Sequence, residues 1–121
     1  MAAPAELLSL INQVRVRNRL GALKPDRRLA AVAQTRAADM ARRRYLSHTS
    51  PEGRSPWDDL RDAGITYSAA AENLAKTSGS SQDVVKMWMN SPPHRANLLN
   101  PRFTLAGIGI ERDFAVLLLA A

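Results

Sequence analysis

The sequence predicts a single domain of the α+β class over residues 1–121. Its length of 121 residues suits one domain and leaves no room for a second. In the first half, apolar residues recur at intervals of three and four, as they do along one face of a helix. Near the end, short apolar segments separated by turns are typical of strands. Helices first and short, antiparallel strands later indicate an α+β fold.

Two helices are predicted near the N-terminus. The first covers residues 4–18, with an apolar face of Leu7, Leu10, Ile11 and Val14. Asp26 is expected to cap a second helix that runs to about Tyr45. The core face of that helix is predicted to consist of Leu29, Val32, Ala33, Ala37, Met40 and Ala41. Arg42–Arg44 would lie in its last turn, where the helix dipole favours positive charge.

Three shorter helices are predicted from their start signals. Ser-Pro at 55–56 and at 91–92 is the pattern of an N-cap followed by proline in the first turn. Ser80 and Asp83 resemble a capping box. Trp57 and Trp88, in two of these helices, are predicted to anchor the core and not to bind a ligand.

Strands are predicted close to residues 72–75, over 103–110 and over 114–119. Gly107 and Gly109 weaken the pattern of the second of these strands. The last one is continuously apolar, which indicates a central position in the sheet.

Composition and charge restrict the function. The chain has no cysteine, which excludes disulfides, a thiolate metal site and a cysteine nucleophile. No apolar run is long enough to cross a bilayer, and we expect no signal peptide in this sequence and a monomer. The net charge of +6 favours anionic partners, such as a cell-envelope polymer. Nucleic acid is disfavoured because Arg15, Arg17 and Arg19 form no stripe and no aromatic residues alternate with basic ones.

Five residues are candidates for a site. His48 and His94 stand in polar, turn-rich segments; they either share a site or serve as separate structural histidines of their loops. Glu72 lies in an apolar segment and is either exposed at a strand end or held by partners. Asn73 is expected to bond backbone groups in a turn, and Ser91 to be a helix N-cap and not a nucleophile.

Several segments in a fixed order resemble the bacterial branch of the CAP superfamily, the SCP-like extracellular domains. They are Ser-His-Thr-Ser-Pro-Glu-Gly (47–53), Ala-Glu-Asn-Leu-Ala (71–75), Trp-Met-Asn-Ser-Pro-Pro-His-Arg-Ala-Asn-Leu-Leu (88–99), Phe103 and Gly-Ile-Gly (107–109). The resemblance covers most of the chain, from the first helix to about Ile110. It implies a three-layer α-β-α sandwich around a small antiparallel sheet, and an extracellular or cell-envelope location.

The resemblance also implies a central cleft in which His48, His94 and Glu72 bind a divalent metal such as zinc. Ser91 stands where many animal and plant members have a second glutamate, so zinc should bind weakly. The chain ends in Asp-Phe-Ala-Val-Leu-Leu-Leu-Ala-Ala, without the Tyr-Trp-x-Gln-x-Phe strand of many bacterial relatives. We therefore expect a shortened or remodelled last strand.

Three functions follow from these observations. The first is a binding domain whose His48/Glu72/His94 cleft takes a metal or a small amphipathic ligand, without catalysis. The second is a hydrolase that uses zinc-bound water, with Glu72 as the base. The third is a basic adaptor for an anionic cell-envelope polymer or for nucleic acid, independent of the histidines.

Overall fold

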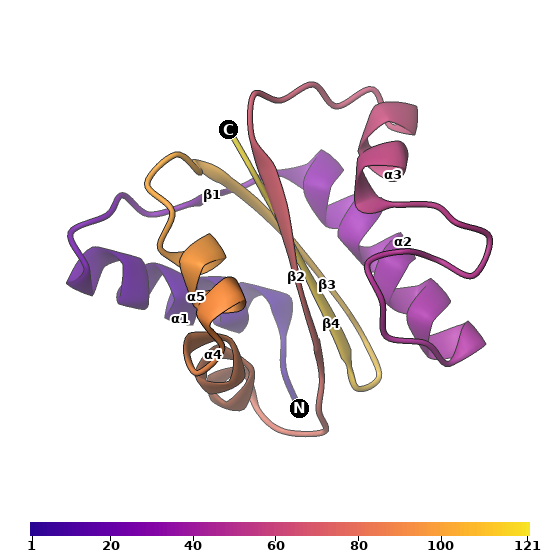
Figure 1. The fold of residues 1–121 in the computed structure, drawn as a ribbon. Helices are drawn as coiled ribbons and strands as arrows, with labels where there is room; N and C mark the ends of the chain where they lie inside the picture. Colours follow the sequence, from indigo (N-terminus) through magenta and orange to yellow (C-terminus); the bar gives the residue numbers. More distant parts are fainter.

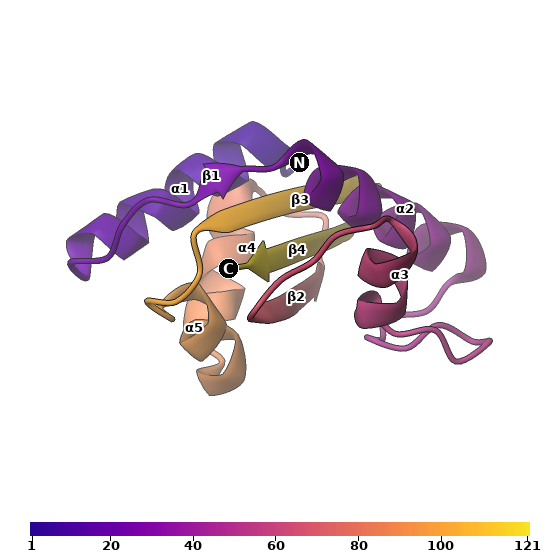
Figure 2. The same ribbon diagram turned by 90° about the horizontal axis from the view of Figure 1, so that it is seen from above.

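Residues 1–121 are all described by a computed structural model, which has three layers (Figures 1 and 2). A four-stranded sheet lies in the middle. Helices α1, α4 and α5 cover one face, and α2 and α3 cover the other. The elements are α1 (Pro4–Arg17), β1 (Lys24–Pro25), α2 (Arg27–Arg43), α3 (Pro56–Asp62), β2 (Ala70–Lys76), α4 (Ser81–Met89), α5 (Pro92–Leu98), β3 (Leu105–Glu111) and β4 (Phe114–Ala120). This arrangement confirms the predicted α-β-α sandwich.

The order of strands in the sheet is β1-β3-β4-β2. The last strand, β4, lies between β3 and β2 and pairs with both in antiparallel register over all seven of its residues. Its predicted central position is confirmed, and at seven residues it is as long as its two neighbours. The two-residue strand β1 pairs with β3 in parallel, which the sequence pattern did not indicate. Strand β2 forms one edge of the sheet.

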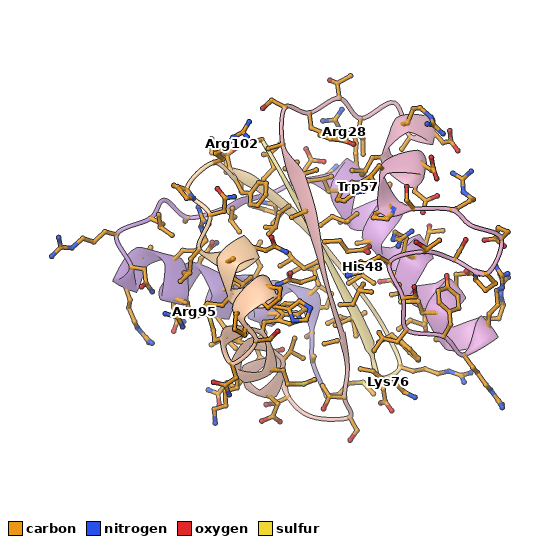
Figure 3. The ribbon with its side chains drawn as sticks, in the orientation of Figure 1. Arg28, His48, Trp57, Lys76, Arg95 and Arg102 are labelled. Atoms are coloured by element: carbon orange, nitrogen blue, oxygen red, sulfur yellow. The ribbon has the colours of Figure 1, made fainter.

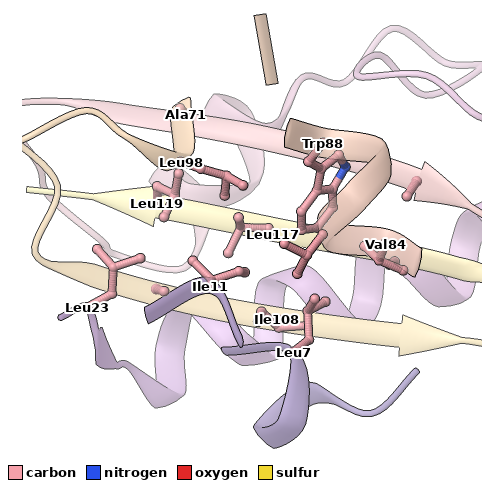
Figure 4. Close-up of a cluster of buried hydrophobic side chains, with 14 of the residues drawn as sticks. Leu7, Ile11, Leu23, Ala71, Val84, Trp88, Leu98, Ile108, Leu117 and Leu119 are labelled. Carbon is pink, nitrogen blue, oxygen red and sulfur yellow. The ribbon is translucent and has the colours of Figure 1, made fainter. Parts of the chain in front are cut away.

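The core is divided by the sheet into two apolar clusters. Along β4, alternate side chains enter opposite clusters: Ala115, Leu117 and Leu119 face α1, α4 and α5, whereas Phe114, Val116, Leu118 and Ala120 face α2 and α3. Figure 4 shows the first cluster, in which Trp88 packs with Leu117 and Val84. Because β4 contributes to both clusters, it is buried along its whole length.

Three predicted helix starts have the expected capping bonds. The Asp26 carboxylate accepts hydrogen bonds from the backbone N–H groups of Arg28 and Leu29 at 2.9 and 3.0 Å. Ser55 with Asp58, and Ser80 with Asp83, form reciprocal capping boxes. All six residues predicted for the core face of α2 are buried.

Two glycines of β3 allow α2 to lie directly on the sheet. A Cβ atom at Gly107 would overlap the backbone of Leu29 and Ala30, and one at Gly109 would overlap the backbone of Ala33 and Gln34. The two glycines that weaken the strand pattern in the sequence are thus required for close helix–sheet packing.

The prediction that Trp57 anchors the core is wrong, whereas Trp88 is buried with 1% exposure. Trp57 is 40% exposed and packs against Tyr67, with ring centroids 6.4 Å apart. In the short helix α3 the inward positions belong to Pro56 and Leu60, one turn apart, so Trp57 lies on a different face. None of the five helices combines the length and the apolar character that a membrane span requires.

Candidate functional site

Glu72 is a buried carboxylate in the middle of β2. Its side chain is 1% exposed, although carboxyl groups are almost never fully buried unless they are paired. Both carboxylate oxygens accept hydrogen bonds from the guanidinium of Arg36, at 2.6 Å from Nε and 3.2 Å from Nη2. The sequence left two alternatives for Glu72, exposure at a strand end or burial with partners. The structure shows the second, because Glu72 is buried and bonded to Arg36.

Arg36 is the central hydrogen-bond donor around Glu72. It projects from α2, is 5% exposed, and also donates to the Asp59 carboxylate at 2.7 Å and to the backbone oxygen of His48 at 2.8 Å. Burial alone would lower the pKa of Arg36, but the hydrogen bonds and negative charges of Glu72 and Asp59 outweigh burial and raise it. Arg36 thus links α2, α3, β2 and the loop that carries His48.

Arg36 is not among the residues that the sequence singled out. A signal was present, because residue 36 falls on the same helical stripe as the core positions Val32, Ala33, Ala37 and Met40. An arginine on a core stripe predicts either a long side chain that reaches the surface or a buried ionic partner. Only the three-dimensional structure identifies Glu72 as that partner.

His48 is oriented by Glu72 and exposed to solvent. Its Nδ1 atom lies 2.8 Å from a Glu72 oxygen, while 56% of its side chain is exposed. An ionised carboxylate can only accept a hydrogen bond, so the proton is on Nδ1 of His48, and this N–H group donates a hydrogen bond to Glu72. In the neutral imidazole, Nε2 is then left as an acceptor or metal-ligand atom. Figure 3 shows His48 beside β2, on the side of α2 and α3.

A second polar group lies on the other side of β2. Asn73, fully buried, donates from Nδ2 to the backbone oxygen of His94 at 3.1 Å and accepts from Asn97 Nδ2 at 2.9 Å. Asn73 therefore holds α5 against the sheet; the expected bond to a backbone group is present, but Asn73 makes it from a strand and not from a turn. Consecutive strand residues point to opposite faces, which explains why Glu72 and Asn73 serve different helices.

Ser91 differs from its prediction as well. It occupies the N-cap position of α5, but its side chain makes no capping hydrogen bond. Its Oγ atom lies instead 2.9 Å from Nδ1 of His94. Pro93 offers no N–H group at the N2 position, and at the N3 position the Ser91 side chain bonds the ring of His94 and not its backbone N–H. Ser91 thus orients His94 as Glu72 orients His48.

The surroundings of His94 include His48. The pKa of His94 lies below its usual value, first because the ring is partly buried and second because a charge on His48 would be close by. The structure thus brings all five candidate residues together around β2, with one histidine on each side of the strand. No buried polar side-chain atom lacks a hydrogen-bond partner, so the network is complete.

The residues fit a metal ion only in part. An Nδ1–H donated to a carboxylate, as in His48, is the usual second contact of a metal-binding histidine. Glu72, however, already uses both oxygens for Arg36 and His48. No group of three or more histidine, aspartate or glutamate side chains is arranged to hold a metal ion. The set of three metal ligands expected from the resemblance therefore remains a prediction.

A polar cavity of about 520 Å³ adjoins this network, and neither histidine lines it. Arg36 and Asp59 line its inner part, and Arg42, Arg43 and Arg54 line its outer part together with Asp39 and Glu52. Its arginines pair with its acids: Arg43 with Asp39 and Glu52, and Arg54 with Asp59. These internal ion pairs leave the cavity without an unpaired charge to attract a ligand.

Comparisons with known proteins agree with this architecture. Residues 8–116 match the profile of the cysteine-rich secretory protein family, CAP. Two curated relatives come from Bacillus subtilis: the uncharacterized protein YkwD, 40% identical over 104 residues, and the uncharacterized membrane protein YlbC, 34% identical over 109 residues. The matches cover 86% and 90% of this chain, but only 40% and 32% of the relatives. The chain thus spans about a third to two fifths of those proteins.

Solved structures lead to the same family. An SCP-domain extracellular protein from Bacillus anthracis superposes with a TM-score of 0.93 at 32% identity, over 97% of this chain and 39% of that one. An outer surface protein from Borrelia burgdorferi gives a TM-score of 0.89 at 26% identity, over 96% of this chain and 90% of that one. Together with the profile match over residues 8–116, these likenesses show that the chain belongs to the CAP family of cysteine-rich secretory proteins, although it contains no cysteine itself.

Proposed function

We propose that this chain is a ligand-binding domain of an extracellular or cell-envelope protein, and that its ligand contacts the imidazoles of His48 and His94. The observation that carries the proposal is the orientation of both rings: Glu72 bonds Nδ1 of His48, and Ser91 bonds Nδ1 of His94. Each ring is left with its Nε2 atom for a ligand. Fixed rings lose little conformational entropy when they bind, which favours recognition. The similar proteins described as extracellular and outer-surface support the location.

The ligand we propose is a divalent metal or a small amphipathic molecule. Two imidazole nitrogens suit zinc, with water in the remaining positions, and Glu72 would then orient His48 and not bind the metal itself. An amphipathic molecule would use the apolar surface of Trp57 and Tyr67, both 40% exposed, together with the polar imidazoles. Figure 3 shows Trp57 and His48 on the same side of β2.

Zinc binding is tested by calorimetric titration of the parent protein and of His48→Ala and His94→Ala. Weak binding that both substitutions abolish is the expected result, because two imidazoles without a third protein ligand hold zinc loosely. Binding that is indifferent to both substitutions would exclude the cleft as a metal site. The amphipathic alternative is tested by adding dodecanoate and following Trp57 fluorescence, since Trp88 is buried and shielded. An unchanged spectrum would exclude this ligand class at Trp57.

A second candidate function is hydrolysis in the same cleft. The contact of 2.8 Å between His48 and Glu72 favours it, because a carboxylate that orients an imidazole is a common arrangement for a general base. Glu72 is occupied by Arg36 and would not take the proton in this chain. Without a metal, Nε2 of His48 would be the base; in the zinc-dependent form that atom would bind the metal instead and could not also accept a proton. A bound zinc ion would supply an activated water. Turnover that disappears with chelator and in His48→Ala would support hydrolysis, and turnover unaffected by either would contradict it.

A further inference from the structure

The positive charge of +6 is distributed unevenly over the molecule. On the α2 and α3 side, arginines are paired with acids, as in Arg36–Glu72, Arg43–Glu52, Arg54–Asp62 and Arg61–Asp58. By contrast, residues 7–25 and 84–110 contain no aspartate or glutamate at all. These two acid-free segments contain seven of the 17 lysines and arginines. Any surface that they share is therefore strongly basic.

The two acid-free segments meet at one end of the molecule. Arg15 of α1 is 1% exposed, and its guanidinium donates to the backbone oxygens of Gly21, Leu98, Asn100 and Phe103 at 2.8 to 3.1 Å. The backbone N–H of Lys24 donates to Thr104 at 2.8 Å. Figures 1 and 2 both show the end of α1, the connection to β1, and α5 with the loop after it at the same end of the fold. Because its guanidinium is buried and bonded to these four backbone oxygens, Arg15 holds the two segments together and is not available to a ligand.

The remaining cations of this end are free to bind. We define the basic end as the five exposed residues Arg17, Arg19, Lys24, Arg95 and Arg102. None of the five makes an ion pair. Arg102 donates only to the backbone oxygen of Ser68, at 3.4 Å. Figure 3 shows Arg95 and Arg102 on the α5 side of the sheet, away from Lys76. Unpaired guanidinium groups on an acid-free surface are suited to phosphate or carboxylate oxygens.

The chemistry of the surface favours a phosphate backbone without bases. Within residues 7–25 and 84–110 the only Phe, Tyr or Trp residues are Trp88 and Phe103, and they are 1% and 4% exposed. Bases of single-stranded nucleic acid stack on exposed aromatic rings, and this surface offers none from those segments. We propose that the basic end binds a flexible phosphodiester polymer of the cell surface through its phosphates. This site is separate from the His48/His94 cleft, and either proposal can fail without the other.

The test uses poly(glycerol phosphate) as the probe and three variants of the protein. The test variant carries Arg19→Asn, Arg95→Gln and Arg102→Gln. The control variant carries Arg44→Asn, Lys76→Gln and Arg112→Asn, exposed cations outside the basic end, so that both lose three charges. Asn is chosen where φ is positive, 63° at Arg19, 58° at Arg44 and 52° at Arg112. A His48→Ala/His94→Ala double variant separates the cleft from the basic end.

The parent should bind the polymer at low salt, and its affinity should fall as salt rises, because bound phosphates release counterions. The test variant should bind at least about tenfold more weakly, and the logarithmic salt slope should decrease by about two, at roughly 0.7 per lost phosphate contact. The control and the histidine variant should bind like the parent. Circular dichroism and the thermal midpoint establish that each variant is folded; if the triple variant is not, Arg95→Gln alone should reduce the slope by about 0.7.

Three results would overturn the proposal. The first is absence of polymer binding by the parent at low salt. The second is an equal loss of binding in the test and control variants, which would show an effect of net charge without a defined surface. The third comes from two oligonucleotides of equal length, one with bases and one abasic. Comparable binding of both supports phosphate recognition, whereas binding at least about tenfold tighter with bases would identify a nucleic-acid site instead.

Discussion

Replacing Arg36 with Met should strongly destabilise the fold. The guanidinium makes four hydrogen bonds, two of them to Glu72, whose side chain is 1% exposed. After the substitution Glu72 keeps only His48 as a partner, whereas Asp59 keeps Arg54. Breaking a buried ion pair on one side costs about 3–5 kcal/mol, because the remaining charge is desolvated without compensation. For a domain of 121 residues this lowers Tm by about 12–20 °C.

Urea unfolding followed by far-UV circular dichroism measures this loss. Arg36→Met should lower the midpoint with an unchanged m-value. Adding Glu72→Gln to the same chain should restore much of the loss, since the unpaired charge is then removed. Arg61→Met is the matched control, because Arg61 is 71% exposed and its partner Asp58 lies at the surface; its midpoint should match that of the parent. A loss below about 1 kcal/mol in Arg36→Met, or no recovery in the double variant, would refute the reasoning.

Three further outcomes are expected. Gly107→Ala and Gly109→Ala should each prevent tight packing of α2 and lower Tm strongly, whereas Gly21→Ala, with nothing within 4 Å of its added Cβ, should not; equal effects in thermal melts would contradict this packing. The pKa of His94 is lowered on folding, so the unfolded state takes up the proton first, and stability should fall as pH drops below about 6.5. Urea midpoints between about pH 5 and 7 should show a weaker decline in His94→Asn, and an identical decline would contradict the assignment. Trp57→Phe should remove the quenching of protein fluorescence by acrylamide while leaving Tm nearly unchanged, since only Trp57 of the two tryptophans is exposed.

Local signals in the sequence predicted most of the fold. Helix starts were found because Asp26, Ser55 and Ser80 make their bonds within three residues, so the pattern contains both partners. The central strand was found because burial on both faces requires an apolar residue at every position. The short parallel pairing of β1 with β3 was missed. It depends on contacts between segments far apart in the sequence, such as those of Arg15 with Leu98 and of Lys24 with Leu105, and no local sequence pattern contains such contacts.

For the site, the sequence indicated the residues but not their connections. His48, Glu72 and His94 were selected from the character of their segments and grouped into one site through the resemblance, while Arg36 and Arg15 were not distinguished from surface arginines. Both arginines are buried by partners 36 and 83 positions away along the chain, Glu72 and Leu98. An arginine side chain reaches either water or a buried acceptor, and only tertiary packing decides between the two. Trp57 and Ser91 were misjudged for the same reason, since the packing around each decides its orientation and its partner.

The geometry of β2 explains how two consecutive polar residues can be buried in an otherwise apolar strand. Glu72 faces α2 and Asn73 faces α5, so each is satisfied by a different helix and neither competes with the other. Exchanging Glu72 and Asn73 in the sequence would place an amide opposite Arg36 and a carboxylate opposite the backbone oxygen of His94. Both contacts would then be unfavourable, because a buried arginine would lose its counter-charge and two acceptors would face each other. The order of Glu72 and Asn73 in this strand therefore also decides on which side of the strand each histidine is held.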